Sequence, residues 1–387
     1  MALLKTKLAW IHCRIAKWGA LDVFIDLLKE KSDSWKFSKI KIFTIYSELK
    51  NINIDNHKIE ITTALPKRLN KFFQRNSKAK LPILKQIFDY RNLIFFYPIL
   101  MKIISWKIKR YNPDHILISS FAVAKNIDQA KYWICTDAIN RISPKITLYL
   151  HSPMQYIRSH NEEYKQKLKW WKWRLFRRII SRLKKRDLQY REYNEIYTNS
   201  NFTNNLAKKI YNIDGKVKYP KVNQIYFDEK IITKPKEYFV CTWRVVKFVR
   251  EIDLIIKAFN KINYPLIIIW SWPDEQELKK IANDNITFTW RKTPKESIEI
   301  IKNAKWTINL TKESFGLSTA ESLCLWVPVL WYNQWATPEL VNKKSGILIE
   351  NKTEKTIIDN FSIFIKTNRN REEIAENARK TFNNKYI

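Results

Sequence analysis

The residues best suited to chemistry lie at the ends of predicted strands. Glu313 and Glu321 are separated by seven residues in the segment ESFGLSTAE, with Gly316 between them. A helix is expected to start near 315–317, and its free N–H groups and dipole suit a phosphate group. A glycine there lets the backbone approach a ligand closely. The segment therefore indicates an anion site flanked by two carboxylates.

Basic residues and one histidine follow other predicted strands. Arg244 and Arg250 come shortly after the strand YFVCT, with Lys247 between them, and His151 follows the strand in YLHSPM. Fixed positive charge stabilises a phosphate group that gains negative charge as it leaves. A lone histidine is more often structural than functional, and arginines on a loop are often merely solvated.

The elements that would position these residues alternate between strand and helix. In the first half, strands are expected at 7–12, 39–47, 115–120 and 146–151. In the second half, short apolar strands and amphipathic helices alternate from 238 to 332. This order predicts an α/β fold with doubly wound parallel sheets, whose ligands bind beyond the carboxyl ends of the strands.

Length and linker composition predict two domains. The chain has 387 residues, and Lys and Pro cluster near 220–235. We expect an N-terminal, acceptor-side domain over 1–225 and a C-terminal, ligand-binding domain over 226–387. The last helix is expected to pack back on the first domain.

Charge and cysteine usage narrow the function classes. The net charge is +34, from 71 basic and 37 acidic residues. This excess reflects either an AT-rich genome or a negatively charged partner, such as nucleic acid, an anionic membrane or a phosphorylated ligand. The four cysteines form no CxxC pair, which argues against a disulfide framework or a zinc site and favours a reducing cytoplasm.

No targeting or spanning segment is evident. The start MALLKTKLAW lacks the apolar core of a signal peptide, and the longest apolar run, 93–101, is too short to span a bilayer. The segment 158–192 is long, basic and helix-prone. It would lie either on anionic lipid or over the first domain as a solvated helix pair. We expect a cytoplasmic protein, peripheral on the inner face of the membrane.

Glycine and tryptophan usage is unusual. The chain has 4 glycines and 16 tryptophans, whereas average glycine usage of about 7% predicts roughly 27. Several tryptophans lie in strand-end segments that read as glycine turns when W is replaced by G: CTWR, IIIWSWPD, FTWRK and PVLWYNQWA. Such turns need φ > 0 or close backbone approach, which glycine provides and tryptophan does not.

With that replacement, 238–350 resembles the retaining GT-B glycosyltransferases of the large nucleotide-sugar-dependent family. The diagnostic stretch is Glu-x7-Glu in ESFGLSTAE, followed by LWVPV in place of GVPV. In the first half, the resemblance continues through KWGALDVF, YLHSPMQYI, YTNSNFT and YPKV, and the last three of these segments resemble a mannosyltransferase-like subgroup. The resemblance implies two Rossmann-like domains facing a cleft.

The resemblance also implies roles for individual residues. Arg244 would bind the donor phosphate, and Arg250 stands where the family usually has lysine, with Lys247 as a substitute. Glu313 would face the donor sugar, Glu321 would accept hydrogen bonds from the ribose, and His151 would lie near the reaction centre. The catalytic set is thus His151, Glu313, Arg244 and Arg250, and the further donor-binding residues are Trp18, Gly19, Trp243, Lys247, Arg291, Ser314, Phe315, Gly316, Leu317 and Glu321.

The tryptophans at family glycine positions suggest a hypothesis about the gene. Some bacterial lineages read UGA as glycine, whereas a common translation table reads it as tryptophan. The family pattern has glycine at Trp18, Trp243, Trp270, Trp272, Trp290, Trp326, Trp331 and Trp335; Trp35, Trp106, Trp173 and Trp306 are further candidates, and Trp10, Trp133, Trp170 and Trp171 are unassigned. The alternative is a lineage that uses tryptophan at these sites.

The function implied by the resemblance is transfer of a sugar from a nucleotide sugar to a lipid-linked or growing cell-surface glycan. GDP-mannose is the favoured donor, configuration is retained, and no metal or other cofactor is expected. The alternatives are a UDP-sugar-dependent glucosyl- or galactosyltransferase and a basic nucleic-acid- or glycan-binding protein without activity. No nucleic-acid-binding module is recognisable in the sequence.

Overall fold

The chain folds into two compact units. The computed structural model describes residues 6–15, 25, 37–54, 57–76, 93, 96–127, 144–154, 180–189, 191–242, 252–269, 275–289, 292–366 and 370–383. The first unit comprises Met1–Asn199 and Thr203–Val217, and the second comprises Ser200–Phe202 and Lys218–Ile387. The domain boundary expected from the sequence, at 225/226, stays a prediction.

The first unit is built on an eight-stranded sheet of order β3-β4-β2-β1-β5-β6-β7-β8. The pairs are parallel except for the antiparallel edge strand β3 on β4, which the sequence patterns did not predict. The strands are β1 (Lys7–Ile15), β2 (Lys39–Ser47), β3 (Asn51–Ile54), β4 (His57–Thr63), β5 (His115–Ser120), β6 (Lys145–Leu150), β7 (Glu195–Thr198) and β8 (Lys216–Val217).

Strand β1 shows why this sheet is central to its unit. Leu8 and Trp10 pack into one apolar cluster, while Ala9 and Ile11 pack into another on the opposite face. A strand buried on both faces is typical of a parallel sheet covered on both sides. The chain order reverses between β1 and β5, so the carboxyl ends of these two strands form the unit's topological switch point.

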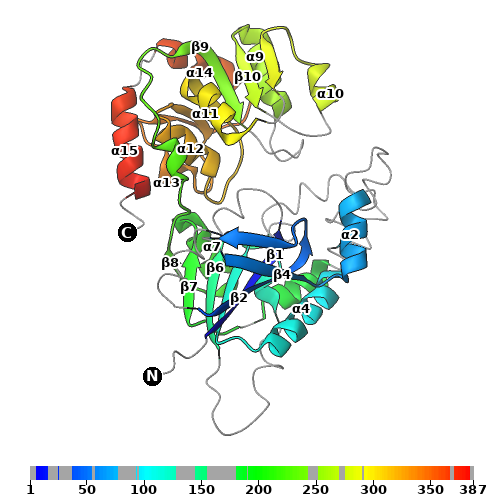
Figure 1. Ribbon diagram of the computed structural model, residues 1–387. Coiled ribbons are helices and arrows are strands. Elements are labelled where there is room, and N and C mark those ends of the chain that lie inside the picture. The colour runs from blue at the N-terminus through cyan, green and yellow to red at the C-terminus, as the bar shows by residue number, and fades with distance from the viewer. Residues whose placement is uncertain are drawn as a thin grey trace. The chain divides into compact units, whose positions relative to one another are not determined.

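Helices of the first unit include α2 (Lys67–Asn76), α4 (Tyr97–Tyr111) and, from Thr203 on, α7 (Asn201–Tyr211), with a short 3-10 turn, η2 (Ala124–Asn126), after β5. Leu100, Met101, Ile104 and Ile108 of α4 are buried, at the spacing of one helical face. The helix lies close to β2 (Figure 1). It ends at Asn112, whose φ is 53°.

The second unit contains a six-stranded, entirely parallel sheet of order β11-β10-β9-β12-β13-β14. Its strands are β9 (Lys236–Thr242), β10 (Leu266–Ile269), β11 (Ile286–Thr289), β12 (Ala304–Asn309), β13 (Val329–Tyr332) and β14 (Gly346–Ile349). Its helices are η3 (Gln224–Tyr226), α9 (Ile252–Ile262), α10 (Glu275–Lys279), α11 (Pro294–Lys302), α12 (Leu317–Cys324), α13 (Thr337–Leu340), α14 (Glu354–Lys366) and α15 (Arg371–Asn383).

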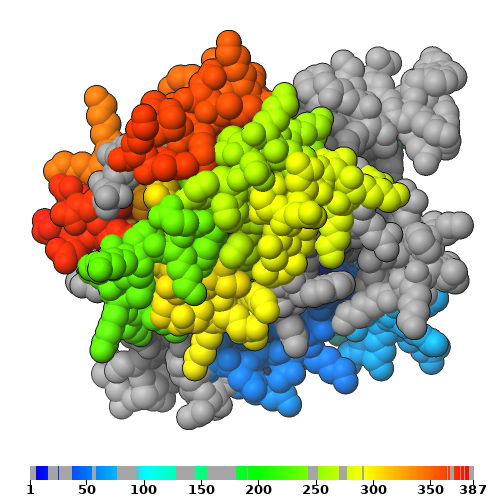
Figure 2. Space-filling view, turned by 90° about the horizontal axis from the view of Figure 1, so that it is seen from above, coloured from blue at the N-terminus to red at the C-terminus, as the bar shows by residue number. Residues whose placement is uncertain are grey.

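Aromatic packing joins the helices of the second unit to its sheet. Phe239 of β9, Phe259 of α9 and Phe361 of α14 form ring contacts with centroid distances of 5.3 to 6.2 Å. Arg371 of α15 is buried and donates to the Lys302 carbonyl at 2.9 Å. Accordingly, the orange and red C-terminal helices lie beside the green and yellow segments of the same unit (Figure 2).

No helix among the described segments combines the length and the apolar character needed to cross a bilayer.

Candidate functional site

In the second unit, the carboxyl ends of β9 and β12 form the topological switch point, and Glu313 lies in the loop after β12. The Asn309 side chain accepts a hydrogen bond from the Thr311 backbone N–H at 2.9 Å. The Thr311 hydroxyl lies 3.2 Å from Glu313 Oε1, and the Ala336 N–H donates to the Glu313 carbonyl at 3.2 Å. The half-buried Glu313 carboxylate therefore sits in a loop held at both its backbone and its side chain.

Helix α12 begins four residues after Glu313 with an unusual N-terminus. Gly316 has φ of 96° and occupies the N-cap, where no side chain caps the helix and no acidic residue stands in the first turn. A Cβ on Gly316 would lie 3.1 Å from Thr319 Oγ1, so both the conformation and the space favour glycine. An uncapped helix start with no acidic residue in its first turn suits an anion.

The residues around this helix start are held by packing. Phe315 is buried, with its ring 5.6 Å from that of Tyr219 and 6.5 Å from that of Phe382. The Ser314 carbonyl accepts a hydrogen bond of 2.6 Å from Ser200, which belongs to the same unit. Glu321 is on the second turn of α12 and half-buried.

In the first unit, His151 directly follows β6, next to the β1–β5 switch point. Its backbone N–H donates to the Ser120 carbonyl at 2.8 Å, and its Nε2 lies 2.8 Å from Ser119 Oγ. The same Ser119 hydroxyl lies 3.0 Å from Nδ1 of His12 on β1. One serine hydroxyl thus joins two imidazole rings at the ends of three adjacent strands.

Both histidines of this group are neutral at neutral pH. Burial lowers the pKa of His12 to about 4, partly offset by a hydrogen bond to the Ser119 backbone. Burial, together with the nearby His12, lowers the pKa of His151 to about 3. Loss of hydration disfavours the charged imidazolium in both cases.

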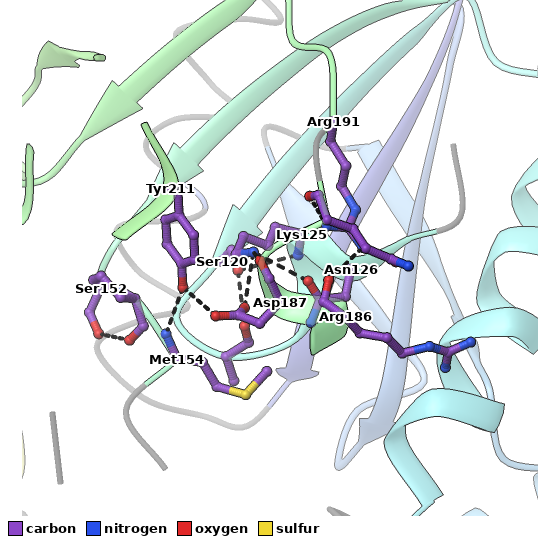
Figure 3. Close-up of polar contacts among 12 residues, drawn as sticks. Ser120, Lys125, Asn126, Ser152, Met154, Arg186, Asp187, Arg191 and Tyr211 are labelled. Atoms are coloured by element: carbon purple, nitrogen blue, oxygen red, sulfur yellow. Dashed lines mark hydrogen bonds and ion pairs between the residues drawn. The ribbon is translucent and has the colours of Figure 1, made fainter. Parts of the chain in front are cut away.

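The loop after His151 is anchored by a buried ion pair (Figure 3). Lys125 Nζ lies 2.9 Å from Asp187 Oδ1, and the two side chains are 3% and 0% exposed. The Tyr211 hydroxyl donates to Asp187 Oδ2 at 2.7 Å and accepts from the Met154 N–H at 3.4 Å. The Lys125 ammonium also lies 4.1 Å from the centroid of the Tyr211 ring. Three residues after His151, the chain is therefore tied to a buried charge pair.

Comparison with known families decides the nature of the second unit. Residues 224–381 match the family described as "Glycosyl transferases group 1". Over these residues, the second unit is similar to a group 1 glycosyltransferase domain. The enzyme class expected from the sequence, a nucleotide-sugar-dependent glycosyltransferase, is confirmed. No match was found among curated proteins.

Solved glycosyltransferases share the fold of the whole chain. Sucrose-phosphate synthase of Thermosynechococcus elongatus superposes with a TM-score of 0.69 at 11% identity, covering 98% of this chain and 95% of its own. WaaG, a glycosyltransferase of lipopolysaccharide biosynthesis, gives 0.64 at 11% identity, covering 97% and 95%. HepE of Anabaena, in complex with UDP and glucose, gives 0.63 at 12% identity, covering 98% and 95%. The predicted fold class, two Rossmann-like units of the GT-B type, is confirmed.

The glycosyltransferase domain brings together one group of the predicted site residues. Glu313, Ser314, Phe315, Gly316, Leu317 and Glu321 all lie at the β12–α12 junction. The remaining predicted donor-site residues lie outside the described residues: Trp18, Gly19, Trp243, Arg244, Lys247, Arg250 and Arg291. Their roles stay predictions, as do those of the described residues. Among the residues that the structure describes, no cluster of three or more His, Cys, Asp or Glu side chains could hold a metal ion.

At its far end, α12 of the glycosyltransferase domain closes with a Schellman motif. The Trp326 N–H donates to the Leu323 carbonyl at 2.9 Å, and the Val327 N–H donates to the Ser322 carbonyl at 3.0 Å. Trp326 occupies the C′ position with φ of 54°, where glycine is preferred. Its side chain is fully buried, and its indole N–H has no hydrogen-bond partner.

Trp326 differs from most other described residues that have a positive φ. Among described residues other than glycine, positive φ occurs at Asn112, Asn212, Asn263, Trp326 and Trp335. The three asparagines are exposed, and asparagine is the residue that tolerates this conformation best after glycine. Trp335 has φ of 59° and its ring stacks on that of Phe202 at 5.2 Å. Trp331, by contrast, lies within β13.

Sequence reasoning missed His12 and Ser119. They are 107 residues apart, and only the parallel register of β1 and β5 pairs them. A signal was present, because each is a polar residue that directly follows an apolar run within its strand. Without the strand order, that signal could not be linked to His151.

Proposed function

We propose that the chain transfers a hexose from a nucleotide-sugar donor to a lipid-linked or growing cell-surface glycan, with retention of configuration. GDP-mannose is the favoured donor. The observation that carries the proposal is the start of α12. It is an uncapped helix N-terminus with a left-handed Gly316, beyond a switch point of the sheet, inside the matched glycosyltransferase domain.

The proposed mechanism follows from the charge that develops on the leaving group. As the nucleoside diphosphate leaves, negative charge grows on its β-phosphate and needs fixed donors. The N–H groups of α12 supply these, together with Arg244 and Arg250, or Lys247 in place of the latter. The acceptor hydroxyl attacks from the face that the phosphate leaves, and that phosphate takes the acceptor's proton.

The remaining roles concern the sugars. Glu321 accepts hydrogen bonds from the ribose hydroxyls, Glu313 faces the donor sugar, and His151 contacts the same sugar. A neutral histidine suits this role because it can donate an N–H without repelling or neutralising nearby groups. The half-buried carboxylates and the low pKa of His151 support these assignments.

The alternative donor is a UDP-sugar. It is favoured by one observation: the Anabaena neighbour that covers 98% of this chain is a complex with UDP and glucose. A glucosyl- or galactosyltransferase would use the same α12 start, because the diphosphate is common to both donor classes. The donors therefore differ in the base and the sugar that the site accepts.

A donor panel tests the proposal. The chain is incubated with GDP-mannose, UDP-glucose and UDP-galactose, and nucleoside diphosphate release is measured with and without a lipid-linked acceptor. Glu321→Gln should weaken donor binding about 10-fold or more, because it removes charge-assisted hydrogen bonds. Glu299→Gln, at an exposed glutamate of α11, is the matched control. Salt-sensitive DNA binding without turnover of any donor would refute the proposal and favour the nucleic-acid alternative.

We also propose that glycine stands in the native protein at the eight tryptophans in family glycine positions. The positive φ of Trp326 and Trp335 supports this, because a bulky residue there costs roughly 1–2 kcal/mol. A peptide mass spectrum of the native protein across 313–340 tests it directly. Tryptophan masses at 326, 331 and 335 would overturn the idea. Glycine masses would require activity assays on a chain with glycine at all eight positions, here called the glycine-recoded chain.

An anionic membrane surface is the proposed location of the acceptor. Most of the basic segment 158–192 lies outside the described residues, but α2 supports the same partner. Leu69 and Phe72 of α2 are 48% and 47% exposed. The helix also carries Lys67, Arg68, Lys71 and Arg75, and no acid. Each basic residue near an anionic surface contributes about 1 kcal/mol.

Vesicle co-sedimentation tests the membrane contact. The chain should pellet with phosphatidylglycerol vesicles and not with phosphatidylcholine vesicles. Leu69→Ser with Phe72→Ser should reduce pelleting several-fold, while Ile363→Ser, at a similarly exposed position of α14, should not. Equal pelleting of both variants would contradict the assignment to α2.

A further inference from the structure

The contacts among His12, Ser119 and His151 limit which ring nitrogens can carry a proton. Ser119 is fully buried and His12 is 2% exposed. A serine hydroxyl carries one proton and accepts through its lone pairs. The two ring nitrogens that face Ser119 Oγ, at 3.0 and 2.8 Å, therefore cannot both receive a proton from it.

The two contact distances indicate which ring receives the serine proton. The His12 Nδ1 contact, at 3.0 Å, has the usual length of an N–H···O bond, whereas the His151 Nε2 contact, at 2.8 Å, is shorter, as bonds from hydroxyl donors are. His12 is therefore assigned its proton on Nδ1, on the side of Ser119. The Ser119 hydroxyl then donates to Nε2 of His151. A neutral imidazole whose Nε2 accepts must carry its single proton on Nδ1.

We propose that Ser119, backed by His12, is a positioning residue that holds His151 as its Nδ1–H tautomer, so that this N–H is the group that His151 offers to a ligand. The proposal rests on the proposed function only for the identity of that ligand, a sugar. The ring is further oriented by Tyr149, which meets it edge-on at a centroid distance of 4.8 Å. The His151 backbone is fixed by its N–H bond to the Ser120 carbonyl. The contact with Ser119 then fixes the rotation of the His151 side chain.

The charge state follows from the same packing. With both rings neutral above about pH 5, His151 acts as a hydrogen-bond donor and not as a proton acceptor. The rate of sugar transfer should therefore show no rise with a pKa near 6.5.

The first test is spectroscopic and needs no substrate. The full glycine-recoded chain is labelled with ¹⁵N-histidine, and the ring nitrogen shifts of His151 are assigned through a His151→Asn variant. We expect the Nδ1–H pattern in the unaltered chain and a shift toward a mixed tautomer population in Ser119→Ala. A pure Nε2–H pattern, or no change in Ser119→Ala, would overturn the proposal.

The second test is kinetic. Ser119→Ala should lower kcat roughly 10- to 100-fold with little change in KM, because the donor still binds but the N–H is misplaced. His12→Asn, whose amide can stand where Nδ1 stood, should keep activity within about 3-fold, whereas His12→Phe should lose about 10-fold. Ser105→Ala removes another buried hydroxyl, in α4, and serves as the control.

The outcomes separate the two proposals. If the unaltered chain turns over no nucleotide sugar but shows the expected tautomer change, the proposed function fails and the positioning of His151 stands. If the chain is active and Ser119→Ala matches Ser105→Ala in both rate and spectrum, the positioning role is wrong. Far-UV circular dichroism of each variant excludes loss of folding as the cause.

Discussion

Trp10 and Trp326 are both fully buried, yet their surroundings differ. Trp10 lies within β1, paired with Ile42 of β2 and Leu117 of β5, and it packs in an apolar cluster. Trp326 lies at a helix end with φ of 54°, a conformation that a residue with a Cβ rarely adopts. Burial alone therefore does not show that a large side chain belongs at its position. The backbone conformation must also be one that residues with a Cβ adopt.

The largest effect is expected at Trp10. Trp10→Gly should lower the free energy of unfolding by more than about 3–5 kcal/mol, because it empties a packed site and places glycine in a central strand. Urea unfolding measures this loss. If that variant does not fold, Trp10→Phe should still fold with a smaller loss. A tolerated Trp10→Gly would break the comparison and place Trp10 among the glycine positions.

Trp326→Gly should act in the opposite direction and raise the free energy of unfolding by about 1–3 kcal/mol. The gain comes from relief of left-handed strain, roughly 1–2 kcal/mol, and from removal of a buried unpaired N–H, about 1–3 kcal/mol, less some lost packing. The same urea titration measures it. A loss of about 3–5 kcal/mol would mean that Trp326 is packed as a native core residue and that glycine leaves a cavity.

Lowering the pH should destabilise the first unit, which contains Trp10, more than the second unit, which contains Trp326. All five histidines precede residue 200, and the folded-state pKa values of His12 and His151, about 4 and 3, lie below the ordinary value of 6.5. Between pH 6.5 and about pH 4, the unfolded chain binds more protons than the folded chain. The stability contributed by the two neutral rings is therefore complete above pH 6.5 and falls as the pH drops. From pH 7.5 to 5.5 the loss should be about 1–3 kcal/mol.

Hydrogen exchange measures this loss in each unit separately. After correction for intrinsic rates, peptides of β1 should lose protection, and peptides of α12 should lose less. His12→Asn should reduce the loss at β1. Equal losses in both peptides would show that the histidines are not its source.

The smallest effect concerns the exposed counterpart of Trp326. Asn112 ends α4 at φ of 53°, and it is exposed. Asn112→Trp should cost about 1–2 kcal/mol, since the strain appears without overpacking. Asn112→Gly should be neutral or gain a few tenths of a kcal/mol. Thermal unfolding of both variants measures the strain alone, and a neutral Asn112→Trp would remove the strain argument at Trp326.

Most of the sheet architecture was predictable from the sequence. Short apolar segments such as HILISS and LIII are too brief for helices and recur between amphipathic segments, which favours parallel strands. The hairpin of β3 and β4 was not predicted. Its strands, NINI and HKIEITT, mix polar and apolar residues at an edge of the sheet, where burial on both faces is not required.

The candidate site was predictable only where it is local in sequence. Glu313, Gly316 and Glu321 lie within nine consecutive residues, and a single strand–loop–helix junction brings them together. The pairing of His12 with Ser119 depends on which strands are neighbours, and single-sequence patterns do not carry that information. The Schellman geometry at Trp326 was implied by the glycine pattern of the family and by nothing in the properties of tryptophan.

The buried pair of Lys125 and Asp187 has a consequence for how this protein can change over generations. Replacing either residue alone leaves a buried charge without its partner and costs about 3–5 kcal/mol, whereas replacing both with apolar residues of similar volume can be neutral. Single substitutions at these positions should therefore be selected against, and descendants of this gene should keep the pair or exchange both residues together. The residues at positions 125 and 187 are therefore expected to covary.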